Sequence, residues 1–267
     1  MDELHLDTNR RWWDERTAIH AKSALYDLPG FRAGRSTLFP FELEEMGDVT
    51  DQTLLHLQCH IGLDTLSWSR LGALTTGLDF SPPAIAFARS LAEEIGLVAD
   101  FVVAAVDDAP EALGRQFDIV YTGRGALIWL PSIDRWAEVV SRLLRPGGRL
   151  YLAEFHPLAD AMAGELPCFE ADYREGSAIL DGSPGDYTDR ELATLNNDTV
   201  EWVHPLGAVV TAIAHAGLVI EQVVERDETY FQRFPELIES SPGIWKFPQD
   251  RPQIPLSYSL RAHKPTP

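Results

Sequence analysis

The 267-residue sequence contains little cysteine and no long uninterrupted apolar run. Its two cysteines, Cys59 and Cys168, are too few for a disulfide framework, which favours a reducing compartment. No stretch stays apolar and uncharged over the roughly 20 residues that cross a bilayer, so no membrane span is expected. The acidic N-terminus, Met1–Asp7, lacks the basic and apolar regions of a signal peptide. We therefore expect a soluble, cytoplasmic protein without a membrane partner.

Positive charge is also scarce. Lysine and arginine number 22 against 41 aspartates and glutamates, which gives a formal net charge of −19. Such a field repels phosphate backbones, so we expect no nucleic acid partner. It is compatible with a cationic ligand, and it equally fits a plain requirement for solubility. The charge therefore excludes partners more than it selects them.

Short apolar runs alternate with helical patterns between residues 51 and 156. An amphipathic helix is predicted over Ser81–Ile95, with Ser81 as the N-cap and Pro82 at the first helical position. A second helix, Ser132–Leu144, ends before Pro146-Gly147-Gly148. Alternating strands and helices predict a doubly wound, parallel α/β sheet with its ligand crevice at the carboxyl ends of the strands. The predicted strands are Leu54–Leu57, Ala73–Leu78, Phe101–Ala104, Phe117–Tyr121 and Arg149–Glu154.

The pattern changes on both sides of this core. Residues 157–203 are rich in Gly, Pro, Asp and Glu, and a segment of this length is typical of a substrate-binding insertion. A helix at His204–Ala216 and strands at Leu218–Glu225 and Leu256–His263 follow, and the two strands are expected to pair antiparallel at a sheet edge. The sheet then has seven strands. With a helical N-terminal segment over residues 1–50, we expect residues 1–267 to form a single domain.

The order of four motifs identifies a resemblance. Residues 54–157 resemble the class I S-adenosylmethionine-dependent methyltransferases, and the resemblance implies a Rossmann-like fold with this cofactor. The first motif aligns with Leu54–Gly62 and the second with Gly77–Ser81. The fourth-strand and fifth-strand signatures align with Phe117–Val120 and Leu143–Leu150.

The first motif departs from the family's pattern. His56 stands in place of an acidic residue, and Gln58 and His60 replace two of three glycines. The Gln-Cys-His-x-Gly form is similar to that of a bacterial subgroup of small-molecule enzymes. A nicotinamide dinucleotide site is the rival interpretation, but its pyrophosphate needs close glycine backbone, which these side chains deny.

The resemblance implies a set of cofactor contacts. Asp79 is expected to hold the ribose, Phe80 to pack on adenine, and the N–H of Val106 to reach the adenine ring, with Asp107 as the acceptor for its amino group. The N-terminal segment resembles the family's helical lid, and Tyr26 is the candidate for an aromatic residue near the sulfonium. The other expected contacts are Gln58, Cys59, His60 and Gly62 in the loop, and Thr122 and Gly123 on the methionine side.

Methyl transfer needs a positioned acceptor and, for some acceptors, a base. Candidate bases are His156 after the fifth strand, His204 at the next helix, and Glu170, Asp172 and Tyr173 in the insertion. No metal site is predicted, because the histidines and cysteines lack metal-ligand spacing, and a Mg²⁺ held by acids of the insertion stays open for an acceptor that carries a diphosphate. We expect transfer to a small-molecule acceptor, in specialised metabolism, by a monomer or homodimer. The acceptor atom stays open among O, N and C, and the alternative is a fold relative that binds the cofactor without methylating.

Overall fold

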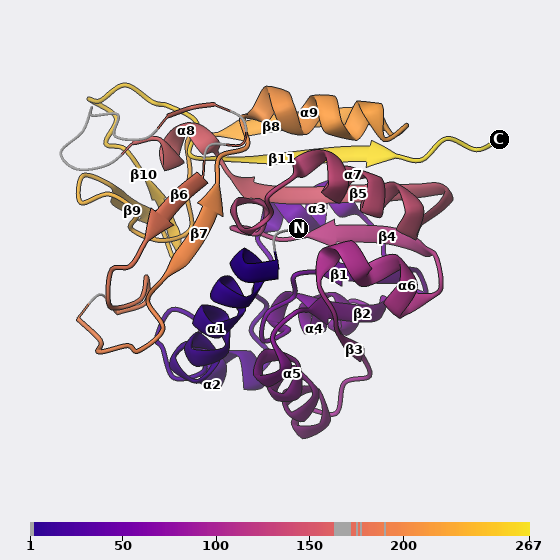
Figure 1. Ribbon diagram of the computed structural model, residues 1–267, viewed down its shortest axis with the longest axis horizontal. Helices are drawn as coiled ribbons and strands as arrows, with labels where there is room; N and C mark the ends of the chain where they lie inside the picture. The colour runs from indigo at the N-terminus through magenta and orange to yellow at the C-terminus, as the bar shows by residue number, and fades with distance from the viewer. Residues whose placement is uncertain (1–2, 163–171, 175, 177, 190) are drawn as a thin grey trace.

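The computed structural model describes residues 3–162, 172–174, 176, 178–189 and 191–267 (Figure 1). A seven-stranded sheet forms its centre, in the order β3-β2-β1-β4-β5-β11-β8. The strands are β1 (Thr53–Leu57), β2 (Leu74–Asp79), β3 (Asp100–Val103), β4 (Phe117–Thr122), β5 (Leu144–Phe155), β8 (Val219–Arg226) and β11 (Ser257–His263). Strands β1 to β5 pair in parallel, and β11 runs antiparallel between β5 and β8. The predicted mainly parallel sheet with an antiparallel last strand is confirmed.

Helices cover both faces because neighbouring residues of a strand point to opposite sides. On one face Leu55 and Leu57 join the buried cluster of α7 (Ile133–Leu143) and α9 (Leu206–His215). On the other face Leu54 packs with Trp68 of α4 (Leu63–Arg70) and Met46 of α3 (Pro40–Met46). The sheet is therefore doubly wound, as predicted.

Helix α5 (Pro82–Glu94) follows the sequence prediction closely. The Ser81 hydroxyl accepts the backbone N–H of Ala84 at 3.3 Å, as an N-cap should. The buried face consists of the predicted apolar positions, among them Ile85, Ala88 and Leu91. The other short elements of the core are α2 (Leu28–Arg32), α6 (Ala109–Leu113), α8 (Pro157–Asp160) and two 3-10 turns, Val106–Asp108 and Leu127–Trp129.

Two hairpins that the sequence analysis did not predict stand beside the sheet. Strands β6 (Ala178–Asp181) and β7 (Thr199–Trp202) pair antiparallel within the insertion. Strands β9 (Ile238–Ser241) and β10 (Ile244–Lys246) pair in the long segment before β11. The lack of alternating hydrophobicity in these segments hid both hairpins.

The N-terminal helix α1 (Glu3–His20) lies beside β7, although about 180 residues separate them in the chain (Figure 1). The side-chain amide of Asn9 donates to the carbonyl of Val200 at 2.7 Å and accepts the Val200 N–H at 2.8 Å. The fully buried Arg16 donates to the carbonyls of Gly185 at 3.0 Å and Asn196 at 2.5 Å. Helix α1 and the insertion are thus bound to each other by buried polar contacts.

Candidate active site

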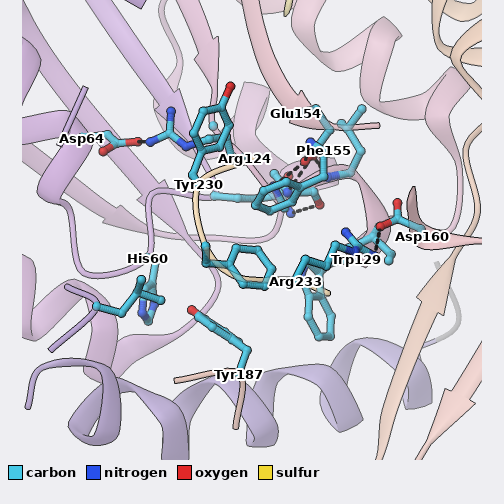
Figure 2. A pocket seen from close by; sticks show the side chains of 18 of the residues that line it. His60, Asp64, Arg124, Trp129, Glu154, Phe155, Asp160, Tyr187, Tyr230 and Arg233 are labelled. Atoms are coloured by element: carbon cyan, nitrogen blue, oxygen red, sulfur yellow. Dashed lines mark hydrogen bonds and ion pairs between the residues drawn. The ribbon is translucent and has the colours of Figure 1, made fainter. Parts of the chain in front are cut away.

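A cavity of about 1480 Å³ opens at the carboxyl ends of β1, β2, β4 and β5. Single-ligand sites occupy roughly 300–1,000 Å³, so this cavity has room for two small molecules. Figure 2 shows polar groups along its walls, including His60, Asp64, Arg124 and Glu154. The predicted site residues that line it are Tyr26, Gln58, Cys59, His60, Asp79, Phe80, Gly123 and His204.

The loop after β1 keeps a glycine-like backbone without the glycines. Gln58 and His60 have φ angles of 57° and 49°. These angles lie in the left-handed region, which costs a residue other than glycine roughly 1–2 kcal/mol. The Gln58 amide Nε2 donates to the carbonyl of Ala126 at 2.9 Å, which links this loop to the one after β4. Its Oε1 is buried and has no hydrogen-bond partner within the described residues. Gln58 therefore offers an acceptor at the cavity wall.

Gly62 serves the packing of the fold and is not among the described residues that line the cavity. Its φ is 80°, and a Cβ there would lie 2.8 Å from the Cβ of Ala88 and 2.9 Å from the Cε1 of Phe101. Glycine is required because α5 and β3 pack directly against this turn. The expected direct contact with the cofactor therefore receives no support from the geometry.

Asp79 ends β2 with its carboxylate inside the cavity wall. Its two oxygens accept the N–H of His60 at 2.8 Å and the N–H of Ser81 at 2.9 Å. Burial raises the pKa of Asp79 to about 6, which the two N–H groups oppose and the charge of Asp14 reinforces. The carboxylate is thereby held in a fixed orientation with acceptor capacity to spare. Phe80 lies next to it on the same wall.

The residues expected to contact the adenine and those at the end of β4 lie partly outside the cavity lining. Val106, Asp107 and Thr122 are outside the set of described residues that line the cavity. Val106 is buried in the core against α7, and Asp107 lies 3.7 Å from the guanidinium of Arg135. Gly123 does line the cavity, where an added Cβ would lie 3.3 Å from His56 Nε2.

Asp64 brings a carboxylate close to His56, the position at which the family's motif has an acidic residue. Burial lowers the pKa of His56 to about 4, so its imidazole is neutral, and its Nδ1 pairs with the hydroxyl of Thr65 at 2.9 Å. Asp64 Oδ2 lies 3.2 Å from Arg124 Nη2, and Glu42 Oε2 lies 2.6 Å from Arg124 Nη1. Asp64 and Arg124 both line the cavity (Figure 2), and neither was among the predicted site residues. The acidic first turn of α4 was the available signal for Asp64.

The aromatic rings of Phe39 and Tyr230 enclose the Arg124 guanidinium. Its carbon lies 4.9 Å from the Phe39 ring centre and 5.3 Å from that of Tyr230. Two carboxylates and two rings thus hold one cation at the cofactor end of the cavity. Glu42, on α3, comes from a segment whose pairing with Arg124 no local pattern reveals.

The candidate bases are scattered. His156 is buried, and its Nε2 lies 2.8 Å from Glu225. Its Nδ1 accepts the N–H of Leu158 at 3.1 Å, so His156 caps α8. It is not one of the described residues that line the cavity. Tyr173 is 40% exposed, and its hydroxyl accepts the N–H of Leu206 at 3.4 Å. Like Asp172, it is not a described lining residue. Glu170 lies outside the described residues. His204 lines the cavity and its Nε2 donates to the carbonyl of Leu130 at 2.6 Å.

Glu154, at the end of β5, lines the cavity beyond the cofactor loops. Its carboxylate accepts the N–H groups of Ala126 and Leu127, each at 2.9 Å, and that of Gly125. Burial nevertheless raises its pKa to about 7. Further along this wall, Arg233 lies 2.5 Å from Asp160 (Figure 2).

The described residues contain neither a metal-binding cluster nor a membrane-spanning helix. No group of three or more His, Cys, Asp or Glu side chains among them could hold a metal ion. None of their helices is both long and apolar enough to span a bilayer.

A family model described as a methyltransferase domain matches residues 55–150, which run from β1 into β5. Residues 55–150 are thus similar to the methyltransferase domains that this model describes. The resemblance seen in the four motifs is thereby confirmed for the segment that contains them.

Individual proteins agree with this assignment. A ubiquinone biosynthesis O-methyltransferase from Xanthomonas axonopodis pv. citri is 30% identical over 155 residues, which are 57% of this chain and 60% of that protein. The chain thus spans about 60% of the length of this curated relative.

Solved structures share the fold. An S-adenosylmethionine-dependent methyltransferase from Clostridium acetobutylicum superposes with a TM-score of 0.58 at 14% identity, covering 96% of this chain and 98% of that one. The geranyl diphosphate C-methyltransferase of Streptomyces coelicolor, solved with S-adenosyl-L-homocysteine, gives 0.52 at 13% identity, covering 84% and 74%. The chain therefore shares the fold of these S-adenosylmethionine-dependent methyltransferase structures.

Proposed function

We propose that this protein binds S-adenosylmethionine in the cavity and transfers its methyl group to a small-molecule acceptor. The observation that carries the proposal is Asp79, a buried, oriented carboxylate at the end of β2 inside a cavity with room for two ligands. The similarity of residues 55–150 to a methyltransferase domain supports methyl transfer as the reaction. The acceptor in this proposal is a small molecule, because the cavity suits one and a net charge of −19 disfavours nucleic acid; its place in specialised metabolism stays a prediction.

The described residues fit the cofactor. Asp79 would accept hydrogen bonds from the two ribose hydroxyls, and Phe80 would lie against the adenine. The buried, unpartnered Oε1 of Gln58 and the carboxylate of Asp64 would receive the ammonium group. Arg124 would face the carboxylate at the same end. When bound, the cofactor supplies an electrophilic methyl group on a positively charged sulfur.

The chain's own contribution is to position the acceptor and exclude water. The lid helix α1 and the segment after it supply Trp13 and Tyr26, whose rings line the cavity and can lie against a sulfonium. Trp129, Phe155 and Trp202 extend this apolar surface toward Glu154. Relatives named above carry O- and C-methyltransferase names, so the acceptor atom is a separate question.

The test is binding followed by turnover. Calorimetry should give saturable binding of S-adenosylmethionine and S-adenosylhomocysteine and none of NAD. Methyl-labelled S-adenosylmethionine should then transfer label to one or more members of a panel of small phenols, amines and enols. Binding without transfer to any member would favour the cofactor-binding module without methyl transfer, and binding of NAD alone would contradict the proposal.

A further inference from the structure

Three segments that are distant in the chain meet in one hydrogen-bonded row beside the cofactor loop. His60 belongs to the loop after β1, His20 ends α1, and Asp186 lies in the insertion. His60 Nε2 lies 2.8 Å from His20 Nδ1, and His20 Nε2 lies 3.0 Å from Asp186 Oδ2. The side chains of His20 and Asp186 are completely buried. His60 lines the cavity, in whose walls Figure 2 also shows Tyr187.

The proton positions in this row follow from its carboxylate end. Asp186 Oδ1 accepts the N–H of Thr188 at 2.8 Å and its hydroxyl at 2.6 Å, and these bonds and His20 lower the pKa of Asp186 against the opposing effect of burial. An ionised Asp186 can only accept, so His20 must carry a proton on Nε2. When each imidazole carries a single proton, His20 Nδ1 is the acceptor and His60 Nε2 is its donor. The remaining lone pair of the row is on His60 Nδ1.

His60 Nδ1 is the atom whose partner is missing. It is buried and has no hydrogen-bond partner within the described residues. A buried polar nitrogen without a partner loses the hydrogen bond that it makes with water in the unfolded chain, and a ligand donor would restore such a bond. Burial holds the pKa of His60 well below its usual value, so the ring is neutral at neutral pH. With its single proton on Nε2, the ring keeps a lone pair on Nδ1.

We infer that His60 is a catalytic base, and that His20 and Asp186 are positioning residues that fix its tautomer. This inference rests on the proposed function and deepens it by naming the acceptor class as a hydroxyl compound. As the acceptor oxygen gains the methyl group from sulfur, its O–H bond breaks and an N–H bond forms at His60 Nδ1. The O–H electron pair stays on oxygen, and the proton leaves to water after the products dissociate.

The charge balance of the cavity favours this assignment. Transfer turns a cationic sulfonium into a neutral thioether while the base gains one positive charge. The site therefore keeps the same net charge, and the proton on His60 Nε2 can shift to His20 Nδ1, opposite the Asp186 carboxylate. A phenolic hydroxyl has a pKa near 10 and needs such a base at neutral pH, whereas a neutral amine is already nucleophilic.

The other titratable groups around His60 do not offer an equivalent base. Asp79 uses its carboxylate on the N–H groups of His60 and Ser81. Tyr187 and Tyr26 pair through their hydroxyls, and burial raises the pKa of both. The Tyr187 hydroxyl also lies 3.4 Å from His20 Nδ1, as a weaker competitor for the same nitrogen. Among these described cavity residues, His60 combines an unpartnered ring nitrogen with a hydrogen-bonded row, through His20 to Asp186, that fixes its proton.

The deciding experiment is a measurement of histidine tautomers by long-range ¹H–¹⁵N NMR, with and without S-adenosylmethionine. The His60 signal is assigned by its absence in the His60→Gln protein. We expect a neutral ring at pH 7 with the proton on Nε2 and an unprotonated Nδ1. In Asp186→Asn the fixed preference should become a mixture at His20 and His60, while His204, bonded to the Leu130 carbonyl, should not change. A proton on Nδ1 of a neutral His60, or a charged His60 at pH 7, would overturn the relay.

Kinetics adds a second readout with defined probes. With catechol and phenol, His60→Gln should lower single-turnover transfer by about 10²–10⁴-fold when S-adenosylmethionine is saturating. Asp186→Asn should lower it at least about tenfold and shift the acid limb of the pH profile; if it fails to fold, Thr188→Val perturbs the same carboxylate more gently. Equal losses with aniline would contradict the hydroxyl assignment. Failure to bind S-adenosylmethionine contradicts the proposed function instead, and the tautomer result stands even if no probe is methylated.

Discussion

The two ends of the cavity are built in different ways. At the cofactor end, Gln58, Asp79 and Gly123 sit immediately after parallel strands, so the order of strands in the sheet brings them together. At the acceptor end, the residues behind the cavity wall at His60 are joined over long distances in the chain: His20 and Asp186 are 166 residues apart, and Asn9 and Val200, which fix α1 to β7, are 191 apart. The first end follows from local sequence and sheet topology, whereas the second depends on how α1 and the insertion pack. The comparison predicts that substitutions at the cofactor end act through lost charge or backbone strain. Substitutions at the acceptor end are expected to change which histidine nitrogen atoms carry protons.

The largest expected effect is on the ion cluster of the cofactor end. Arg124→Met should lower the free energy of unfolding by about 3–5 kcal/mol, because it leaves the fully buried Glu42 carboxylate without its cation. Urea denaturation measures the loss. The double variant Arg124→Met with Glu42→Gln should recover much of it, and a loss below about 1 kcal/mol in the single variant would show that this end does not depend on the pair.

The backbone of the first loop gives the next effect. Gly62→Ala should cost about 2–4 kcal/mol, since its φ of 80° disfavours a side chain and the Cβ would meet Ala88 and Phe101. Gly96→Ala is the matched control, because its φ is 69° and no atom lies within 4 Å of the added Cβ. It should cost only about 1 kcal/mol. Equal thermal-unfolding losses would contradict the packing role assigned to Gly62.

Cofactor affinity should depend on the Asp79 carboxylate. Asp79→Asn removes charge-assisted hydrogen bonds of about 1.5–3 kcal/mol, so binding of S-adenosylmethionine should weaken roughly 10- to 150-fold in calorimetry. Because the pKa of Asp79 is about 6, wild-type affinity should also fall as the pH drops through that value, and the variant should lack this dependence. Asp107→Asn, which lies outside the described cavity lining, is the control and should change affinity less than twofold.

The smallest effect should appear at Glu154, on the acceptor side. A carboxyl whose pKa is raised to about 7 on folding binds its proton more tightly in the folded state, so the wild-type free energy of unfolding should decrease as the pH rises from about 4.5 through 7. Glu154→Gln cannot titrate and should lack this contribution, which we expect to be about 2 kcal/mol between pH 5 and pH 7.5. Denaturation at pH 5 and pH 7.5 checks it, and identical slopes in the two proteins would contradict the raised pKa.

The parts of the site that the sequence predicted are those set by strand ends. Asp79, Gln58 and the N-cap Ser81 follow from alternating strands and helices, as does the antiparallel β11. Val106 and Asp107 were placed by family analogy alone, and here α7 covers one while Arg135 pairs with the other. His20 and Asp186 carried no local signal, because a polar residue on a helix or in an irregular loop has no periodicity that reveals a distant partner. The hairpin β6–β7 was not predicted for the same reason.

The pairing of Asn9 with Val200 has a consequence for the solubility of the folded chain. A strand at the border of a two-stranded sheet presents free backbone groups that can template pairing with another molecule. The Asn9 amide occupies both the N–H and the carbonyl of Val200, so it acts as a one-residue mimic of a neighbouring strand. A chain shortened past Asn9 would uncover that border, and self-association would accompany the loss of α1.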